Sequence, residues 1–219
     1  VYYKDRLIDK SGIKELRKNV GIVFQDADNQ IIASSVRAEV SFGPMNLGLS
    51  REEVKKRVDD ALNYMNIHHL IDRPPHYLSG GEKKRVSIAD IIAMDSKIII
   101  FDEPTASLDP KNVVIFEEAL DKMSGDGKTL VISTHDIEFA YRFADRIVVF
   151  CDGNIIADGS PIDVLDNEKV LKMANLKKPI LLDVFETLVE KSIVTKDIVP
   201  PRNIEEFRDM FVSQAKSLS

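Results

Sequence analysis

Short apolar runs alternate along the chain with segments whose apolar residues recur at helical spacing. The runs at residues 20–24, 98–101 and 129–133 are continuous and rich in β-branched residues, which is typical of strands covered on both faces of a parallel sheet. A helical pattern containing Val113 follows the second run, and one containing Phe139 follows the third. This order of strands and helices predicts an α/β fold with a parallel sheet at its core.

Two helices are predicted between the first and second strands. Each begins at a capping-box spacing, Ser50 with Glu53 and Ser79 with Glu82, in which serine and glutamate satisfy free N–H groups at the helix start. Apolar residues at helical spacing follow both starts: Val54, Val58, Ala61, Leu62 and Met65 after the first, and Val86, Ala89, Ile92 and Ala93 after the second.

A β-hairpin is predicted after the third strand and its helix. The apolar runs at residues 147–150 and 155–157 flank Asp152 and Gly153, a pair that favours a tight hairpin turn. We therefore expect the sheet to end with an antiparallel ribbon.

The remainder of the chain predicts short helices. Ser160 and Pro161 are typical of a helix start, and residues 162–219 contain few strand signals. Asn203 and Glu206 form a capping box for a last helix whose apolar side contains Ile204, Phe207, Met210, Phe211 and Leu218. This stripe fits ordinary core packing as well as contact with a partner.

Composition excludes several classes of protein. The 219 residues are 44% hydrophobic and 30% charged, which is ordinary for a globular chain and excludes a disordered one. The single cysteine, Cys151, excludes an intrachain disulfide. The net charge of −6 argues against sequence-independent binding of nucleic acid. No apolar run reaches the roughly 18–20 residues that cross a bilayer, so any membrane role is expected at the surface.

Candidate chemistry lies at the strand ends and at the second capped helix. Asp102 and Glu103 follow the second strand, where carboxylates hold Mg²⁺ and orient water for attack on phosphate. Residues 78–82, Leu-Ser-Gly-Gly-Glu, present glycines and free N–H groups that suit an anion. Each feature alone also fits a simpler reading, a solvated turn for the acids and a capping box for the glycines.

Gln25 follows the first strand and His135 follows the third. A glutamine at a strand end binds Mg²⁺ through its side-chain oxygen or orients water, and a histidine there donates to a terminal phosphate. The residues around His135 also fit a simpler interpretation, in which Thr134 or Asp136 caps the next helix. Residues 83–85 form only a short basic patch.

Taken in order, these features resemble the ATP-binding-cassette (ABC) ATPase family, over roughly residues 20–160. The matches are Gln25 for the Q-loop, residues 78–82 for the signature motif, residues 98–103 for Walker B, residues 107–109 for the D-loop and His135 for the switch histidine.

The resemblance implies a P-loop NTPase-like cassette with a parallel sheet core and a helical signature subdomain, acting with ATP and Mg²⁺. Asp102 would hold the Mg²⁺ shell, and Gln25 would sense Mg²⁺ and the γ-phosphate of ATP. Glu103 would be the general base for the attacking water, and His135 would contact the γ-phosphate.

The resemblance also implies a dimer of ATPase subunits, identical or paralogous, that close face to face. The ATP held by one subunit would then be bound by the signature residues of the other, and Asp109 would cross the interface. The signature residues concerned are Ser79, Gly80, Gly81 and Glu82.

Residues 23–30 and 40–49 look like the energy-coupling-factor (ECF) branch, which imports vitamins and transition metals such as cobalt or nickel. That branch implies a cassette at 1–160, and a helical extension at 161–219 that helps two ATPases to pair. Its partners are a transmembrane coupling protein and a substrate-binding membrane subunit, with no nucleic acid, at the cytoplasmic face of the membrane. The alternatives are another ABC transporter class, a soluble ABC ATPase acting on DNA or ribosomes, and a non-catalytic interaction module.

The chain departs from the family in one motif. No GxxxxGK[ST] phosphate-binding loop occurs in the 219 residues, and Gly43 and Gly48, which have the glycine spacing, are followed by Leu49 and Ser50. The chain also begins at Val1 rather than at methionine. We expect an N-terminally truncated sequence rather than a natural loss, and we expect these residues alone not to hydrolyse ATP.

Overall fold

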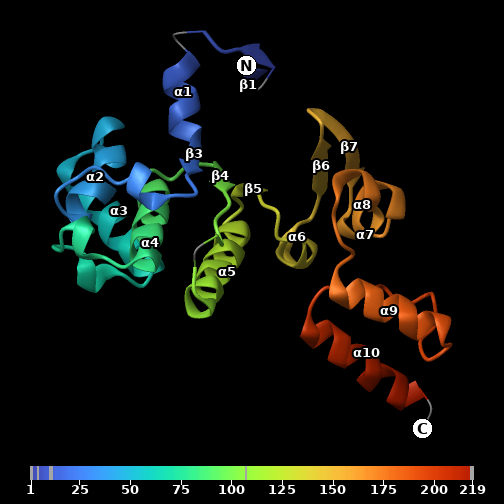
Figure 1. The fold of residues 1–219 in the computed structure, drawn as a ribbon. Coiled ribbons are helices and arrows are strands. Elements are labelled where there is room, and N and C mark those ends of the chain that lie inside the picture. The colour runs from blue at the N-terminus through green and yellow to red at the C-terminus, as the bar shows by residue number, and fades with distance from the viewer. Residues whose placement is uncertain (1, 4, 10–11, 107, 218–219) are drawn as a thin grey trace. The chain divides into compact units, whose positions relative to one another are not determined.

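The computed structural model describes residues 2–3, 5–9, 12–106 and 108–217. It divides the chain into two compact units, Val1–Ser133 and Thr134–Ser219 (Figure 1). The expected division into a cassette at 1–160 and an extension at 161–219 stays a prediction. No helix in the described part of the chain is both long and apolar enough to cross a membrane.

A three-stranded parallel sheet forms the centre of the first unit. β3 (Val20–Val23), β4 (Ile98–Asp102) and β5 (Thr129–Ser133) pair in that order, and each coincides with one of the three apolar runs. Asp102 lies beside Ser133 in the register of β4 and β5. The predicted α/β fold with a parallel core is confirmed.

The elements that precede β3 are not predicted by the hydrophobic pattern. β1 (Tyr2–Tyr3) and β2 (Arg6–Leu7) form a short antiparallel hairpin, and α1 (Gly12–Asn19) leads directly into β3. Only Ile13 and Leu16 of α1 are aliphatic, too few to produce a visible helical repeat.

Three helices pack together between β3 and β4 in the sequence (Figure 1). They are α2 (Val36–Asn46), α3 (Arg51–Tyr64) and α4 (Gly80–Ala93), and α4 contacts both of the others. Ser50 and Ser79 cap α3 and α4 as predicted. Their completely buried side chains include Val36, Val40, Val58, Leu62, Met65 and Val86. Single 3₁₀ turns occur at Ala27–Asn29, His68–Leu70 and Pro75–Tyr77.

One further helix of the first unit packs against the sheet. α5 (Pro110–Gly125) follows β4 in the chain and buries Phe116, Leu120 and Met123. The Phe116 ring lies edge-to-face against Phe101 of β4, with 5.5 Å between the ring centroids. This aromatic contact fixes the helix to the middle of the sheet.

The second unit begins with a helix and a β-ribbon. α6 (Ile137–Phe143) precedes β6 (Ile147–Cys151) and β7 (Asn154–Gly159), which pair antiparallel as predicted. Asp152 and Gly153 have φ values of 49° and 75°, the left-handed conformation that this two-residue hairpin turn requires.

Among the described residues the strands of the ribbon pair with each other, and its expected place at the end of the parallel sheet stays a prediction. Its apolar side chains pack against α7 (Pro161–Leu165) and α8 (Glu168–Ala174), in a cluster that includes Val149 and Leu165.

The chain ends in a pair of helices, α9 (Ile180–Glu190) and α10 (Ile204–Ser217). Asn203 caps α10 as predicted, because its Oδ1 accepts the Glu206 N–H at 2.9 Å; its side-chain amide also donates to the Glu206 carboxylate at 2.6 Å.

The predicted apolar side of α10 is divided between two environments. Phe207 and Met210 pack with Phe185 of α9, whereas Ile204 is 53% exposed and Phe211 is 37% exposed. Leu218, the last member of the predicted stripe, lies outside the described residues.

Two acidic side chains lie where α2 packs on α4. The Glu39 carboxylate is buried and accepts the N–H groups of Ile32 and Ala33 at 3.0 and 2.7 Å. The Asp90 Oδ1 is buried without a hydrogen-bond partner in the described part of the chain. Burial, and then the charge of Glu39, raise the pKa of Asp90 to about 7. Protonated Asp90 therefore suits the folded state better than ionised Asp90.

We expect Asp90→Asn to remove this pH dependence. Because the pKa of Asp90 rises on folding from 3.8 to about 7, its stabilising contribution is complete below pH 3.8 and is lost as the pH rises through 7. In urea unfolding the variant should gain stability over the parent chain between pH 5 and pH 8, by about 2 kcal/mol. Asp60→Asn, at an exposed site on α3, is the control. An advantage that does not change with pH would contradict the assignment.

Candidate functional site

Asp102 ends β4 at the edge of the sheet where the parallel strands finish. Its Oδ1 accepts a hydrogen bond from the Ser133 hydroxyl at 2.6 Å, and Ser133 is the last residue of β5. The Asp102 residue is exposed, so the carboxylate is oriented without being enclosed. Sequence reasoning missed Ser133 as a partner, although its place at the end of an apolar run was visible.

Glu103 has a backbone conformation that is unusual for its residue type. Its φ of 41° lies in the left-handed region, which costs a non-glycine residue about 1–3 kcal/mol. Two backbone hydrogen bonds hold it there: its N–H donates to the Ser133 carbonyl at 2.9 Å, and its carbonyl accepts the Ala106 N–H at 3.2 Å. Strain of this kind concentrates at functional positions, and here it falls on the predicted general base.

Gln25 lies two residues beyond β3, in an exposed segment that is fixed from behind by a buried lysine. The Lys84 Nζ donates to the Phe24 carbonyl at 2.6 Å and to the Gln25 carbonyl at 3.1 Å. Lys84 is only 4% exposed, so this member of the short basic patch at residues 83–85 is buried and acts within the chain. Its position on the inner side of α4 turns it toward the loop.

Two carboxylates near the site favour the charged form of Lys84. Burial lowers the pKa of Lys84 to about 8, and the nearby carboxylates of Asp102 and Asp26 oppose that shift. The neighbouring Lys83 forms an ion pair with Asp28 at 2.6 Å. Two successive lysines of α4 thus contact the segment that carries Gln25.

The predicted signature residues form the start of α4. The Ser79 hydroxyl accepts the Glu82 N–H at 3.3 Å, and the Ser79 N–H donates to the Glu82 carboxylate at 2.8 Å. This backbone hydrogen bond is the main cause that lowers the pKa of Glu82. The predicted capping box is therefore confirmed, and the Glu82 carboxylate is hydrogen-bonded at the start of its own helix.

Gly81, at the start of α4, lies close to Asn112 at the start of α5. A Cβ at this position would lie 2.4 Å from the Asn112 Nδ2, so only glycine fits without displacing Asn112. Asn112 donates to the Asp109 carboxylate twice, through its backbone at 2.9 Å and its amide at 2.7 Å. These bonds lower the pKa of Asp109, with the backbone bond as the largest cause.

A cleft of about 280 Å³ brings three of the predicted motifs together. Gln25 and the residues after it form one side, Gly80 with Lys83 and Lys84 forms a second, and Leu108 forms a third. Among the described residues neither Asp102 nor Glu103 lines this cleft.

Two of the predicted positions remain, Ser107 and His135. Ser107, in the middle of the predicted D-loop, lies outside the described residues. His135 is an exposed residue of the second unit, in the turn before α6. The Asp136 carboxylate caps that helix by accepting the Phe139 N–H at 3.0 Å, as the sequence suggested.

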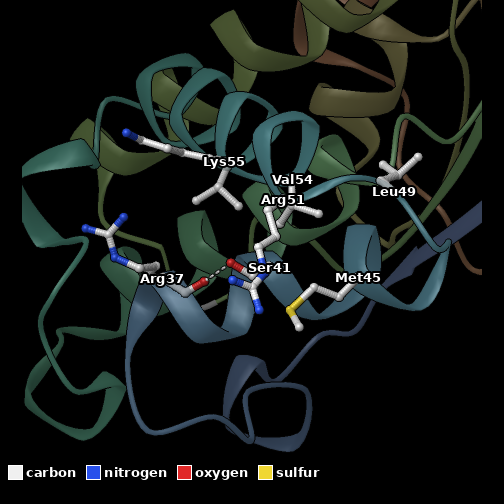
Figure 2. Close-up of a pocket in the computed structure, with 8 residues that line it drawn as sticks. Arg37, Ser41, Met45, Leu49, Arg51, Val54 and Lys55 are labelled. Carbon is white, nitrogen blue, oxygen red and sulfur yellow. Dashed lines mark hydrogen bonds between the residues drawn. The ribbon is translucent and has the colours of Figure 1, made fainter.

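A second pocket, of about 260 Å³, lies between α2 and α3, and Ser41, Met45 and Leu49 of the 40–49 segment line it. Figure 2 shows its labelled side chains, which include both basic and apolar groups: Arg37, Ser41, Met45, Leu49, Arg51, Val54 and Lys55.

Comparison with known proteins gives a consistent family. The ABC transporter family model matches residues 1–106. The chain is 43% identical over 200 residues to the energy-coupling factor transporter ATP-binding protein EcfA2 of Methanospirillum hungatei, covering 91% of this chain and 50% of that protein. It is 39% identical over 205 residues to the corresponding EcfA of Carboxydothermus hydrogenoformans, covering 94% of this chain and 73% of that protein.

The chain belongs to the ABC transporter family. Among solved structures it is similar to cbiO1 of Clostridium perfringens, a part of the ABC transporter complex cbiONQ, with a TM-score of 0.69 and 41% identity. That match covers 84% of this chain and 75% of cbiO1. The M. hungatei and C. hydrogenoformans relatives are ATP-binding proteins of the energy-coupling factor type, and the chain spans about half the length of the M. hungatei protein.

In this ABC protein we expect Lys84→Met to loosen the segment that carries Gln25. The substitution keeps an aliphatic side chain of similar length but leaves the Phe24 and Gln25 carbonyls without their charged donor. Amide hydrogen exchange over residues 24–31 should become at least five-fold faster. Lys83→Met, which loses only the ion pair with Asp28, is the matched control. Equal effects of the two substitutions would show that Lys84 has no special role.

Proposed function

We propose that the protein is the ATP-hydrolysing subunit of an ECF-type ABC importer. In this role it couples ATP binding and hydrolysis to uptake of a micronutrient, a transition metal ion or a vitamin. The observation that carries the proposal is the end of β4, where an oriented Asp102 precedes a strained Glu103. Membership of the ABC family and the names of the similar proteins support it.

The residues divide the work of hydrolysis between them. Glu103 accepts the proton of the attacking water as general base, while Ser133 orients the neighbouring Asp102 carboxylate toward the Mg²⁺ shell. Gln25 orients the water and γ-phosphate region from the loop that Lys84 fixes. His135 donates to the γ-phosphate and stabilises the charge that develops there.

Mg²⁺ fits the donors at this edge of the sheet. The described residues contain no cluster of three His, Cys, Asp or Glu side chains able to hold a metal by themselves. A lone exposed carboxylate and an amide oxygen suit Mg²⁺, which keeps water and phosphate oxygens as most of its ligands. Asp102 and Gln25 would hold it, and when bound it neutralises charge on the phosphates.

The proposal includes three partners. A second ATPase subunit, identical or paralogous, presents its residues 79–82 and Asp109 across the nucleotide. A transmembrane coupling protein docks on the region after Gln25, beside the pocket between α2 and α3. A substrate-binding membrane subunit selects the cargo. The protein then works at the cytoplasmic face of the membrane, without nucleic acid.

We expect Glu103→Gln in the full-length gene product to lower kcat for Mg-ATP at least 100-fold and to leave ATP binding within about three-fold, because only the base is lost. Steady-state phosphate release and nucleotide binding measure the two effects. Glu118→Gln, on the exposed side of α5, is the control. The 219 residues alone contain no GxxxxGK[ST] segment and should be inactive. ATPase activity of this polypeptide that Glu103→Gln abolishes would contradict that expectation.

Affinity purification from membranes tests the transport role. The tagged full-length gene product should bring down a polytopic membrane protein, because the proposal gives it a transmembrane coupling protein as partner. A variant with Met45→Asp in the pocket between α2 and α3 should lose this partner yet keep its nucleotide binding. Recovery with ribosomes or DNA instead would favour a soluble ABC ATPase.

A further inference from the structure

The residues on either side of His135 are hydrogen-bonded at the start of α6. The helix begins at Ile137, and the Asp136 carboxylate caps it by accepting the Phe139 N–H at 3.0 Å. The Asp136 N–H in turn donates to the Thr134 hydroxyl at 3.0 Å. His135 thus lies inside a short turn whose far side is the first turn of α6, so any displacement of α6 displaces His135.

The other end of α6 is held by an arginine from the C-terminal part of the chain. The Arg202 Nε donates to the Tyr141 carbonyl at 2.7 Å, and its Nη2 donates to the Ala144 carbonyl. The last carbonyls of a helix have no partner within the helix, and a cation there also interacts favourably with the helix dipole. Arg202 therefore satisfies the end of α6 both by hydrogen bonds and by charge.

Arg202 is itself attached to the start of α10. Its backbone N–H donates to the Glu206 carboxylate at 2.7 Å, and the Glu206 N–H donates to Asn203, the residue that caps α10. The guanidinium group and the first turn of α10 thus form one connected unit.

Two more contacts join α6 to the same helix pair. The buried Tyr141 donates its hydroxyl to the Pro201 carbonyl at 3.1 Å. The Glu138 carboxylate accepts the N–H of Ile180 at 2.9 Å, at the start of α9, where the preceding Pro179 has no side chain able to cap the helix. α6 is therefore connected directly to the start of α9 and, through Pro201 and Arg202, to the segment that leads into α10.

We propose that Arg202 is a positioning residue, through which the α9–α10 pair holds α6 and so sets the position of His135 during ATP hydrolysis. This inference rests on the proposed function, since His135 acts only in a working ATPase. It gives the C-terminal helices a role in controlling the switch histidine of their own subunit, in addition to the pairing of subunits that the family resemblance implies.

Hydrogen exchange on the full-length gene product tests the physical connection. Arg202→Met keeps an aliphatic side chain but removes both guanidinium contacts, so amides over residues 134–144 should exchange at least five-fold faster. Arg202→Lys keeps the charge but not the two-pronged geometry and should give an intermediate rate. Arg208→Met, at an exposed site on α10, should leave the rate unchanged. Thermal unfolding of each variant establishes that it is folded. If Arg202→Met does not fold, the exchange rate of Arg202→Lys alone tests the connection.

A double-mutant cycle with His135→Ala separates positioning from simple stabilisation. Arg202→Met should lower kcat about five-fold with KM for ATP within two-fold of the parent, and should cause no further loss when His135 is already alanine. Losses that multiply, or exchange over residues 134–144 equal to that of the parent, would overturn the proposal. If the parent protein lacks ATPase activity, the proposed function fails, and the exchange rates alone decide whether the connection exists.

Discussion

The parallel register of β3, β4 and β5 is the constraint on which the candidate site depends. Val23 lies beside Phe101, and Asp102 lies beside Ser133, so the three strands finish at one edge of the sheet. A slip of one residue would turn Phe101 out of the core and Asp102 into it, because side chains alternate between the two faces. The completely buried Phe101 therefore fixes the orientation of the acid that follows it.

Three side-chain donors fix the segments that carry or adjoin the predicted site residues. Lys84 holds the carbonyls near Gln25, Ser133 holds Asp102, and Arg202 holds the end of α6. Hydrogen bonds from a charged group contribute roughly 1.5–3 kcal/mol each, about twice a neutral one, and this offsets part of the cost of burying the charge. This cost is reflected in the pKa of Lys84, which burial lowers.

The sequence predicted what depends on local pattern and missed what depends on distant backbone. Continuous apolar runs predicted the sheet strands, and the spacing of Ser79 and Glu82 predicted a cap that the structure contains. α2 was not predicted, because Gly43 and Pro44 interrupt its pattern. The partners of Lys84 and Arg202 could not be predicted, since each is a backbone carbonyl some sixty residues away and a carbonyl has no signature in the sequence.

The two glycines of the predicted signature motif illustrate how far such a pattern can be interpreted. Gly81 is explained within the chain, because an added methyl would collide with the Asn112 side chain, whose amide donates to Asp109 at the start of α5. Gly80 is not explained in this way, because no heavy atom of the described residues beyond its own turn lies within 4 Å of the place its Cβ would take. Packing therefore requires one glycine and leaves the other with open space in front of the helix start. Open space beside free N–H groups is what close approach of a phosphate needs, so Gly80 gives the stronger support for a ligand at this end of α4.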